Sequence, residues 1–370
     1  MSFKDFTFEP DLARAGTLPA DWYFAPDILE AEFKHIFGRT WQLAGPAKQV
    51  AEPGSYFTAI IGREPVVVAR GLAGELRAFS NVCRHRAGPV ATGAGTSRHL
   101  RCGYHGWTYG LDGQLLAAPE FDGVQEWCKE DNSLPTFRVE LWKDLVFVNL
   151  SPIGATLSDT FAELSQTVTH DLRSTNPVAR KDWFVDCNWK VYVDNYLEGY
   201  HIPVVHPGLN REIDYAKYRT EVRGIFSLQH SPLKPTKDPR IRTDENSTDA
   251  EAQFFWIYPN LMLNVYPDNY STNLIVPLGP ERTLTVFEWF FRDPESPETQ
   301  KNVQDTIAFS DEIQLEDISI CEAVQRGLRS ATYRSGRYSV KRENGVHHFH
   351  GLIYDYLTNS LTNELPSNSD

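Results

Sequence analysis

Two short segments of the chain each carry one cysteine and one histidine at close spacing. Cys83 and His85 are two positions apart, and Cys102 and His105 are three positions apart. Sixteen residues separate the first pair from the second. Because thiolates and imidazoles occur in equal number, these four side chains fit a metal centre that accepts both kinds of ligand.

An iron–sulfur cluster and a zinc ion are the two candidates for this ligand set. In a Rieske [2Fe–2S] cluster two cysteines bind one iron and two histidines bind the other, whereas a structural zinc ion is bound by all four side chains. Each segment is a short turn with glycine, over 83–89 and 102–107, and neither leads into a zinc-finger helix. Gly88, Gly103 and Gly106 allow backbone N–H groups to approach cluster sulfur atoms. We therefore predict a Rieske cluster, whose neutral imidazoles raise its reduction potential.

A second candidate metal site lies in the segment 188–209, NWKVYVDNYLEGYHIPVVHPGL, which contains His201 and His206. We expect a helix over 188–201 that Pro203 ends, so that His206 folds back beside His201. Two histidines and one carboxylate bind iron in mononuclear Fe(II) oxygenases and leave positions open for O2 and water. Two structural histidines are the alternative, but a one-electron cluster elsewhere in the chain favours a second centre where bonds are made.

Both segments resemble the Rieske non-haem iron oxygenase family. CRHRAG and CGYHGWTYGLDG are similar to the family's Rieske domain, and the block that ends in His-x4-His implies His201 and His206 as iron ligands. The family's third ligand is an aspartate on a long C-terminal helix, and the resemblance of 311–328 implies Asp317. Helical geometry alone does not exclude every rival carboxylate on this helix. The rivals are Glu316, Asp311 and Glu312, of which the last two fit a solvated acidic face.

The resemblance also implies roles for Glu198 and Asn195. The family's acid at the position of Glu198 links the iron ligand His201 to a cluster histidine of the neighbouring subunit, here His105. Many ring-hydroxylating members have aspartate there, whereas glutamate recurs in relatives that hydroxylate or demethylate quaternary amines. The segment VYVDNYLEGYHIP is especially similar to choline monooxygenase-like members. Asn195 matches a family asparagine near the iron, although a helix-surface amide is an equal interpretation.

The pattern of elements predicts an α+β fold of helix-grip type. Residues 1–40 form a helical segment that packs on the catalytic domain, and 41–150 form a small all-β Rieske domain. Residues 151–370 form a catalytic domain with an antiparallel sheet, on which a long helix over 301–328 packs. The polar, proline-containing stretch 231–252 predicts a loop that could act as a lid. The other predicted helices are 27–38, 158–172 and 188–201, and the β runs are 56–61, 65–70, 76–81, 108–109, 145–150, 218–230, 254–266, 271–277 and 283–292.

Composition limits the location and partners of this protein. The chain has 370 residues, with no apolar run as long as a membrane span, and residues 1–6 lack the apolar core of a signal peptide. Five cysteines, an odd three of them outside the cluster, argue against a disulfide framework and predict a cytoplasmic location. A net charge of −13 disfavours nucleic acid or an anionic membrane as a partner. Arginines near the cluster ligands either dock an acidic electron donor or are simply solvated; they are Arg84, Arg86, Arg98 and Arg101.

These observations predict an oxygenase component. It would use O2 and electrons from NAD(P)H, passed on by a separate reductase or ferredoxin, to hydroxylate or N-demethylate a small organic substrate such as a quaternary amine. No G-x-G-x-x-G fingerprint follows a strand, so NAD(P)H is expected to bind the reductase. The alternatives are an aromatic-ring cis-dihydroxylating dioxygenase alpha subunit and, in another class, a Rieske electron carrier without oxygenase activity.

Two further expectations concern the assembly and the substrate. A ring-shaped homotrimer would place each cluster beside the next subunit's iron, so that electrons need not cross one whole subunit. Aromatic residues of the sheet could form a cage for a cation or could equally be core. These aromatic residues are Phe254, Phe255, Trp256, Tyr258 and Tyr266.

Overall fold

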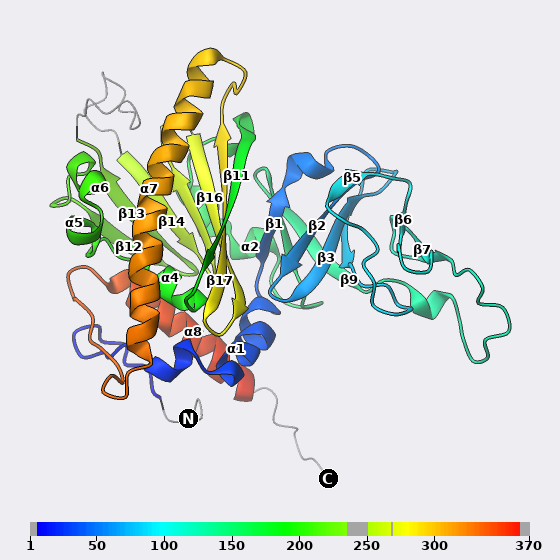
Figure 1. Cartoon of the computed structure of the whole chain (residues 1–370), viewed down its shortest axis with the longest axis horizontal. Coiled ribbons are helices and arrows are strands. Elements are labelled where there is room, and N and C mark those ends of the chain that lie inside the picture. The colour runs from blue at the N-terminus through cyan, green and yellow to red at the C-terminus, as the bar shows by residue number, and fades with distance from the viewer. Residues whose placement is uncertain (1–5, 235–250, 268, 363–370) are drawn as a thin grey trace, which may run out of the picture. The chain divides into compact units, whose positions relative to one another are not determined.

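The computed structural model of the chain describes residues 6–234, 251–267 and 269–362. The chain divides into two compact units, Phe37–Thr167 and a second unit formed by Met1–Ile36 with Val168–Asp370 (Figure 1). Residues 151–167 therefore group with the first unit, whereas the sequence prediction assigned them to the catalytic domain. The physical reason is aromatic packing, since the ring of Phe161 lies 5.5 Å from that of Trp142 and 5.0 Å from that of Phe147.

The first unit is built on a seven-stranded antiparallel sheet with the strand order β1-β10-β9-β4-β3-β2-β5. Val66, Val67 and Val68 are consecutive residues of β3 and all are fully buried, so this strand is covered on both faces. A separate three-stranded sheet has the order β6-β7-β8. The strands are β1 (Gln42–Pro46), β2 (Ser55–Ile61), β3 (Glu64–Arg70), β4 (Leu76–Ser80), β5 (Ala94–Thr96), β6 (His99–Arg101), β7 (Thr108–Gly110), β8 (Leu115–Ala117), β9 (Thr136–Trp142) and β10 (Leu145–Asn149), with helical turns at η4 (Ala47–Val50), η5 (Glu130–Asn132), α2 (Leu157–Thr160) and α3 (Ala162–Thr167).

The second unit contains a seven-stranded antiparallel sheet with the order β11-β17-β16-β15-β14-β13-β12. Helix α7 runs along this sheet (Figure 1) and packs Val303 and Ile307 against Phe287, Trp289 and Phe291. The strands are β11 (Asn176–Val185), β12 (Arg219–Arg223), β13 (Phe226–Pro232), β14 (Glu251–Ile257), β15 (Leu261–Val265), β16 (Asn269–Gly279) and β17 (Arg282–Phe291). The helices are η2 (Ala20–Tyr23), α1 (Pro26–Glu32), η6 (Leu172–Ser174), α4 (Trp189–Tyr196), α5 (Ile202–Val205), α6 (Pro207–Glu212), α7 (Pro297–Leu328) and α8 (Asn344–Thr362), and η3 (Phe33–Phe37) crosses the boundary between the units.

The predicted α+β class, with a β cluster domain and an antiparallel catalytic sheet, is confirmed. The long helix is also present, and it begins at Pro297, where the side chain of Ser296 accepts a hydrogen bond from Thr299 N–H. The sequence prediction missed α8 and several strands, which are β1, β5, β6, β8, β9 and β11. Helix α8 is held by Phe349, whose ring packs against Trp189 and Trp256 at 5.6 and 5.2 Å.

Several predicted elements are shorter or broken in the structure. The helix expected over 27–38 is α1 followed by a π-helical turn, η3, and the helix expected over 158–172 is interrupted at Phe161, which caps α2. The β run expected over 218–230 is the hairpin of β12 and β13, because Gly224 turns the chain with a positive φ of 44°. Most of the expected lid lies outside the described residues, since 235–250 are not among them.

Candidate functional site

The two cysteine-histidine segments adopt the same turn. The carbonyl oxygen of Cys83 accepts a hydrogen bond from Ala87 N–H at 3.0 Å, and that of Cys102 accepts one from Gly106 N–H at 3.1 Å. The fourth residue after each cysteine has a positive φ, 57° at Ala87 and 74° at Gly106. The first turn follows β4 and the second joins β6 to β7. Each cysteine is therefore fixed by its own backbone hydrogen bonds at the start of a tight turn.

The side chains of the two turns converge as a metal cluster requires. Cys83 and Cys102 are buried, and the rings of His85 and His105 are 4.6 Å apart. Among the described residues, the buried Nδ1 atom of His85 has no hydrogen-bond partner. A Cβ atom at Gly88 would come within 3.0 Å of Cys102 Sγ. The unpaired imidazole nitrogen and the close backbone approach both fit a compact iron–sulfur cluster.

A tyrosine that the sequence analysis did not assign adjoins this site. Tyr109 Oη lies 3.3 Å from Cys83 Sγ and accepts a hydrogen bond from Arg84 N–H at 3.0 Å. Burial, together with the hydrogen bond to Cys83, raises the pKa of Tyr109, so its hydroxyl stays protonated and can donate to the sulfur. The only sequence signal for this contact was that Tyr109 follows the second turn within the motif WTYG.

The second site lies after helix α4, and here one predicted detail is wrong. Helix α4 ends at Tyr196, so the helix expected over 188–201 is too long, and Glu198 and His201 both lie beyond its end. The chain turns at Gly199, where a Cβ atom would come within 2.5 Å of the Tyr218 ring. The carboxylate of Glu198 instead accepts hydrogen bonds from the backbone of Tyr200 and His201 and from His201 Nδ1, the last at 2.6 Å.

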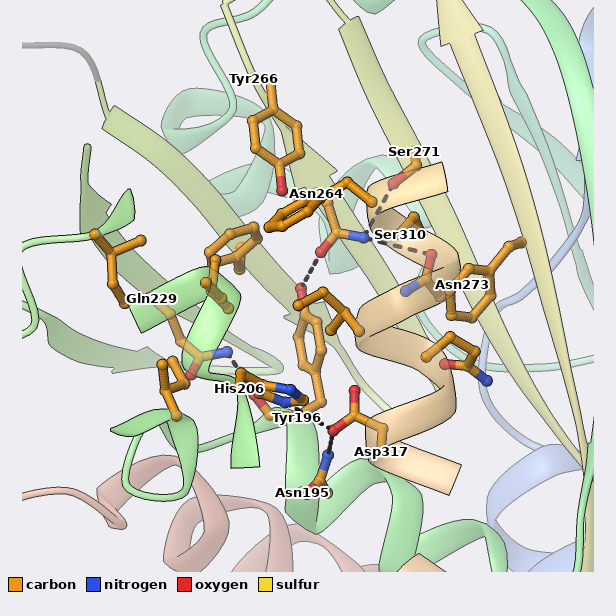
Figure 2. Close-up of a pocket in the computed structure, with 18 of the residues that line it drawn as sticks. Asn195, Tyr196, His206, Gln229, Asn264, Tyr266, Ser271, Asn273, Ser310 and Asp317 are labelled. Carbon is orange, nitrogen blue, oxygen red and sulfur yellow. Dashed lines mark hydrogen bonds and ion pairs between the residues drawn. The ribbon is translucent and has the colours of Figure 1, made fainter. Parts of the chain in front are cut away.

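The structure brings His201, His206 and Asp317 together. One potential ligand atom from each lies within 4.8 Å of the other two. Asp317 Oδ1 is 3.0 Å from His206 Nε2 and 3.9 Å from His201 Nε2, so both imidazoles turn the same nitrogen towards it (Figure 2 labels His206 and Asp317). Two imidazoles and one carboxylate are the donor set of mononuclear iron oxygenases.

The neighbours of this group favour Asp317 over the other carboxylates as the third ligand. Glu316 lies on the far side of His206, where its carboxylate accepts from Nδ1 at 2.7 Å, and Asn195 Nδ2 donates to Asp317 Oδ1 at 2.6 Å. His206 is 2% exposed, and although burial alone lowers its pKa, hydrogen bonds and charges from Asp317 and Glu316 raise the pKa overall. Glu316 is thus an outer partner of His206, a role that the sequence analysis did not foresee. Of the other rivals, the carboxylate of Asp311 pairs with Lys181, and Glu312 is exposed.

A cavity of about 170 Å³ opens beside this group. It lies between α4, α7 and the sheet, and Figure 2 shows Asp317 and Asn195 at one side of it and Asn264 and Ser271 at the other. Of the five aromatic residues considered for a cation cage, Phe254 and Tyr266 line the cavity, with their rings 5.9 Å apart. The other three belong to the buried core. They are Phe255, Trp256 and Tyr258.

Taken together, the fold and the two centres define a Rieske-type oxygenase. A family model described as Ring hydroxylating alpha subunit (catalytic domain) matches residues 161–359, and a model of the Rieske [2Fe-2S] domain matches residues 40–128. The chain belongs to this family. It is an oxidoreductase whose cofactors are a Rieske [2Fe–2S] cluster and a mononuclear iron. The match to a catalytic domain argues against the alternative of a simple electron carrier.

Individual relatives cover nearly the whole chain. The chloroplastic choline monooxygenase of Arabidopsis thaliana is 35% identical over 370 residues, which cover 95% of this chain and 85% of that protein. The carnitine monooxygenase oxygenase subunit of Acinetobacter pittii (strain PHEA-2) is 31% identical over 358 residues and 95% of both chains. A solved quaternary ammonium Rieske monooxygenase, reported with insights into carnitine oxidation and inter-subunit electron transfer, has a TM-score of 0.84 at 28% identity and covers 94% of this chain and 96% of that chain.

Within the described ranges, no helix combines the length and the apolar composition needed to cross a bilayer.

Proposed function

We propose that the chain is the oxygenase component of a quaternary-amine monooxygenase. It takes electrons from a separate reductase or ferredoxin that oxidises NAD(P)H, and it uses O2 to hydroxylate or N-demethylate its substrate. The observation that carries this proposal is the cavity beside His201, His206 and Asp317, which Phe254 and Tyr266 line with aromatic rings. Aromatic faces attract quaternary ammonium groups. The named activities of the choline and carnitine relatives support the same substrate class.

The proposal assigns the residues of both centres. The four side chains of the paired turns hold the cluster, which supplies single electrons, and the two-histidine, one-carboxylate group holds the iron, which supplies O2 activation. The cluster ligands are Cys83, His85, Cys102 and His105, and the iron ligands are His201, His206 and Asp317.

Two residues beside the iron ligands orient them. Asn195 donates to Asp317 Oδ1 and thereby fixes one oxygen of this carboxylate. Glu198 accepts from His201 Nδ1, which leaves Nε2 free to face the metal position. We also propose that Glu198 forms the link to a neighbouring subunit's cluster at His105, in a head-to-tail homotrimer.

Aerobic turnover tests the proposed function. The purified protein, with a generic reductase and NADH, is incubated with a panel of quaternary amines and arenes, and the products are identified by mass spectrometry. Oxidation of a quaternary amine, coupled to O2 uptake, is the expected result. Formation of a cis-dihydrodiol from an arene, with no quaternary amine oxidised, would instead establish the ring-dihydroxylating alternative.

Metal analysis tests the assigned ligands. The purified protein should be red-brown, with acid-labile sulfide in the cluster. Asp317→Ala should lose the mononuclear iron and all oxygenation while the cluster spectrum persists, because a facial triad has no spare protein ligand. Zinc without labile sulfide would contradict the cluster assignment, and normal iron in Asp317→Ala with loss in Glu316→Ala would move the ligand by one residue.

A further inference from the structure

A polar cluster lies in the cavity wall away from the metal-binding group. Asn264 of β15 and Ser271 and Asn273 of β16 are 8%, 7% and 8% exposed. Asn264 pairs directly with Ser271 across the two strands, and Asn273 lies two residues further along the same face. All three line the cavity and are labelled in Figure 2. We call these three residues the amide cluster.

The hydrogen bonds of the amide cluster form a chain in which each side chain donates to the next. Tyr196 Oη donates to Asn264 Oδ1 at 2.8 Å, and burial raises the pKa of Tyr196 so that this hydroxyl keeps its proton. Because Oδ1 of Asn264 accepts, its Nδ2 donates, to Ser271 Oγ at 3.1 Å and to Asn273 Oδ1 at 3.4 Å. The oxygen atoms of Ser271 and Asn273 therefore each already accept one hydrogen bond.

What remains for a ligand is a set of donors. Among the described residues, neither the Ser271 hydroxyl proton nor Asn273 Nδ2–H has an acceptor. Both side chains are nearly buried and line the cavity, where an unmatched donor is costly. The complementary ligand group is an oxygen acceptor, such as a hydroxyl or a carboxylate.

The opposite side of the cavity carries negative charge. The carboxylates of Glu198, Glu316 and Asp317 surround the two imidazoles, which gives three formal negative charges against the two positive charges of Fe(II). The excess negative charge favours a cation at this end. In Figure 2, Tyr196 lies between Asp317 and Asn264, so the two ends of the cavity differ in chemistry.

We infer that the amide cluster binds the oxygen-bearing end of a quaternary amine, so that a carbon bonded to nitrogen faces the metal site. This inference rests on the proposed function and adds the orientation of the substrate. The carbon oxidised would then be an N-methyl or N-methylene carbon, and not the carbon that bears the oxygen.

The reaction balances with the reactants that the proposed function supplies. A substrate R–N⁺(CH3)3 takes one oxygen atom of O2, with two electrons delivered through the cluster from the external donor and two protons, and gives R–N⁺(CH3)2–CH2OH and water. The C–N bond of this carbinol then breaks, and the nitrogen keeps the electron pair. The products are R–N(CH3)2, formaldehyde and a proton.

Binding measurements on the anaerobic holoenzyme test the orientation. The probes are choline, L-carnitine and propyltrimethylammonium, which has the size of choline but no oxygen, and affinity is measured by calorimetry. Asn273→Ala should weaken choline by about 3- to 10-fold, the value of a neutral hydrogen bond, and carnitine by at least as much because its carboxylate is a charged acceptor, and should leave propyltrimethylammonium unchanged. Ser271→Ala, which removes only a hydroxyl group, should give the same pattern of affinities for the three probes.

A substitution that introduces a negative charge distinguishes a ligand with a carboxylate from a ligand with only a hydroxyl group. Asn273→Asp keeps the oxygen that Asn264 uses but replaces the donor with a negative charge, so it should repel a carboxylate and lower carnitine affinity by roughly 10-fold or more. A hydroxyl can donate to the new carboxylate, so choline should be spared. Gln300→Glu makes the same amide-to-carboxylate change at an exposed position of α7 and is the matched control.

Analysis of the reaction products is the last part of this test. Wild-type turnover of the ligand that binds should release formaldehyde or a free amine, whereas an aldehyde formed at the oxygen-bearing carbon would overturn the inference. Equal losses of oxygen-bearing and oxygen-free ligands in Asn273→Ala, in a variant with wild-type melting temperature, would overturn it too. A wild-type enzyme that binds none of the three probes would contradict the proposed function itself, and the inference with it.

Discussion

Each imidazole of the proposed iron site is held by a carboxylate of its own. His201 Nδ1 contacts Glu198 at 2.6 Å, and His206 Nδ1 contacts Glu316 at 2.7 Å. Such contacts fix the tautomer, since Nδ1 carries the proton and Nε2 is left as the ligand atom. The two carboxylates come from different parts of the chain, one from the turn after α4 and one from α7. The metal site is thus oriented from two sides.

The Glu316 contact leads to a first prediction. Glu316→Gln should weaken iron binding by about 10- to 100-fold, because metal affinity commonly falls that far when the partner of a ligating histidine is lost. The measurement is iron retained against a graded chelator, with the cluster absorbance as an internal reference. Glu312→Gln, an exposed change on the same helix, is the control. Equal iron retention in both variants would remove Glu316 from the site.

The sequence indicated the candidate ligands and, by resemblance, the acid beside His201, but not the partner of His206. Cys83, His85, Cys102 and His105 are close in the chain, so their spacing alone indicated a cluster. The partner of His206 is 110 residues away, and only the rotation of α7 against that histidine decides that Glu316 faces Nδ1 while Asp317 faces Nε2. The periodic pattern of a single helix cannot provide that rotation.

At the scale of elements, helix α4 connects the site to the rest of its unit. Its first residues pair with α1 through a fully buried contact between Lys190 Nζ and Glu32 Oε1 at 2.5 Å, and Trp189 Nε1 also donates to Glu32. Its far end stops at Tyr196, whereas the sequence predicted a helix up to His201. The helix pattern continued past this point, but the close approach of Tyr218 at Gly199 is a tertiary contact that no local pattern reports. The sequence prediction also missed α8, although the spacing of Val346, Phe349, Ile353 and Leu357, all of them buried, is helical and was sufficient to indicate it.

The turn at Gly199 gives a second prediction. Gly199→Ala should destabilise the protein by about 1–3 kcal/mol, because the added methyl group would overlap the Tyr218 ring and force the turn to shift. Gly327→Ala is the matched control, since no atom lies within 4 Å of its added Cβ and alanine favours a helix. Thermal unfolding measures both. If Gly327→Ala were less stable than Gly199→Ala, the turn at Gly199 would be shown to tolerate a side chain.

The buried ion pair gives a third prediction. Burial lowers the pKa of Lys190 and raises that of Glu32, and each charge is partly compensated by the other. Glu32→Gln would leave the Lys190 ammonium buried without its counter-ion, at a cost of about 3–5 kcal/mol in the free energy of unfolding. The double variant Glu32→Gln with Lys190→Met should recover part of this loss. A single variant as stable as wild type in urea unfolding would show that the pair is not needed.

At the scale of the whole molecule, the question is how electrons reach the iron. The cluster ligands and the iron ligands belong to separate compact units of the chain. A head-to-tail ring offers each iron site the cluster of the adjacent subunit, and a solved relative is described in terms of inter-subunit electron transfer. Glu198 holds His201 and keeps 12% of its side chain accessible, and the proposed link needs this remaining surface.

Mixed oligomers test this route and give the last prediction. Cys102→Ser should lack the cluster and Asp317→Ala should lack the iron, so neither variant should turn over alone. When the two are co-expressed with different tags, a Cys102→Ser subunit can take electrons from the cluster of its Asp317→Ala neighbour. In a head-to-tail trimer that contains both variants, one of the three interfaces joins an intact cluster to an intact iron, so purified mixed oligomers should show roughly a third of wild-type activity.

The position of Glu198 makes this test specific. Adding Glu198→Gln to the subunit with the intact iron should lower the recovered activity at least about tenfold, because the link to His201 is then weakened where electrons arrive. Adding the same change to the iron-free subunit should have no effect, since that subunit's Glu198 serves an empty site. Both versions carry the same number of substitutions, so a general loss of stability would affect them equally. No activity in tag-verified mixed oligomers would place electron transfer within one chain, and equal losses in the two versions would remove Glu198 from the route.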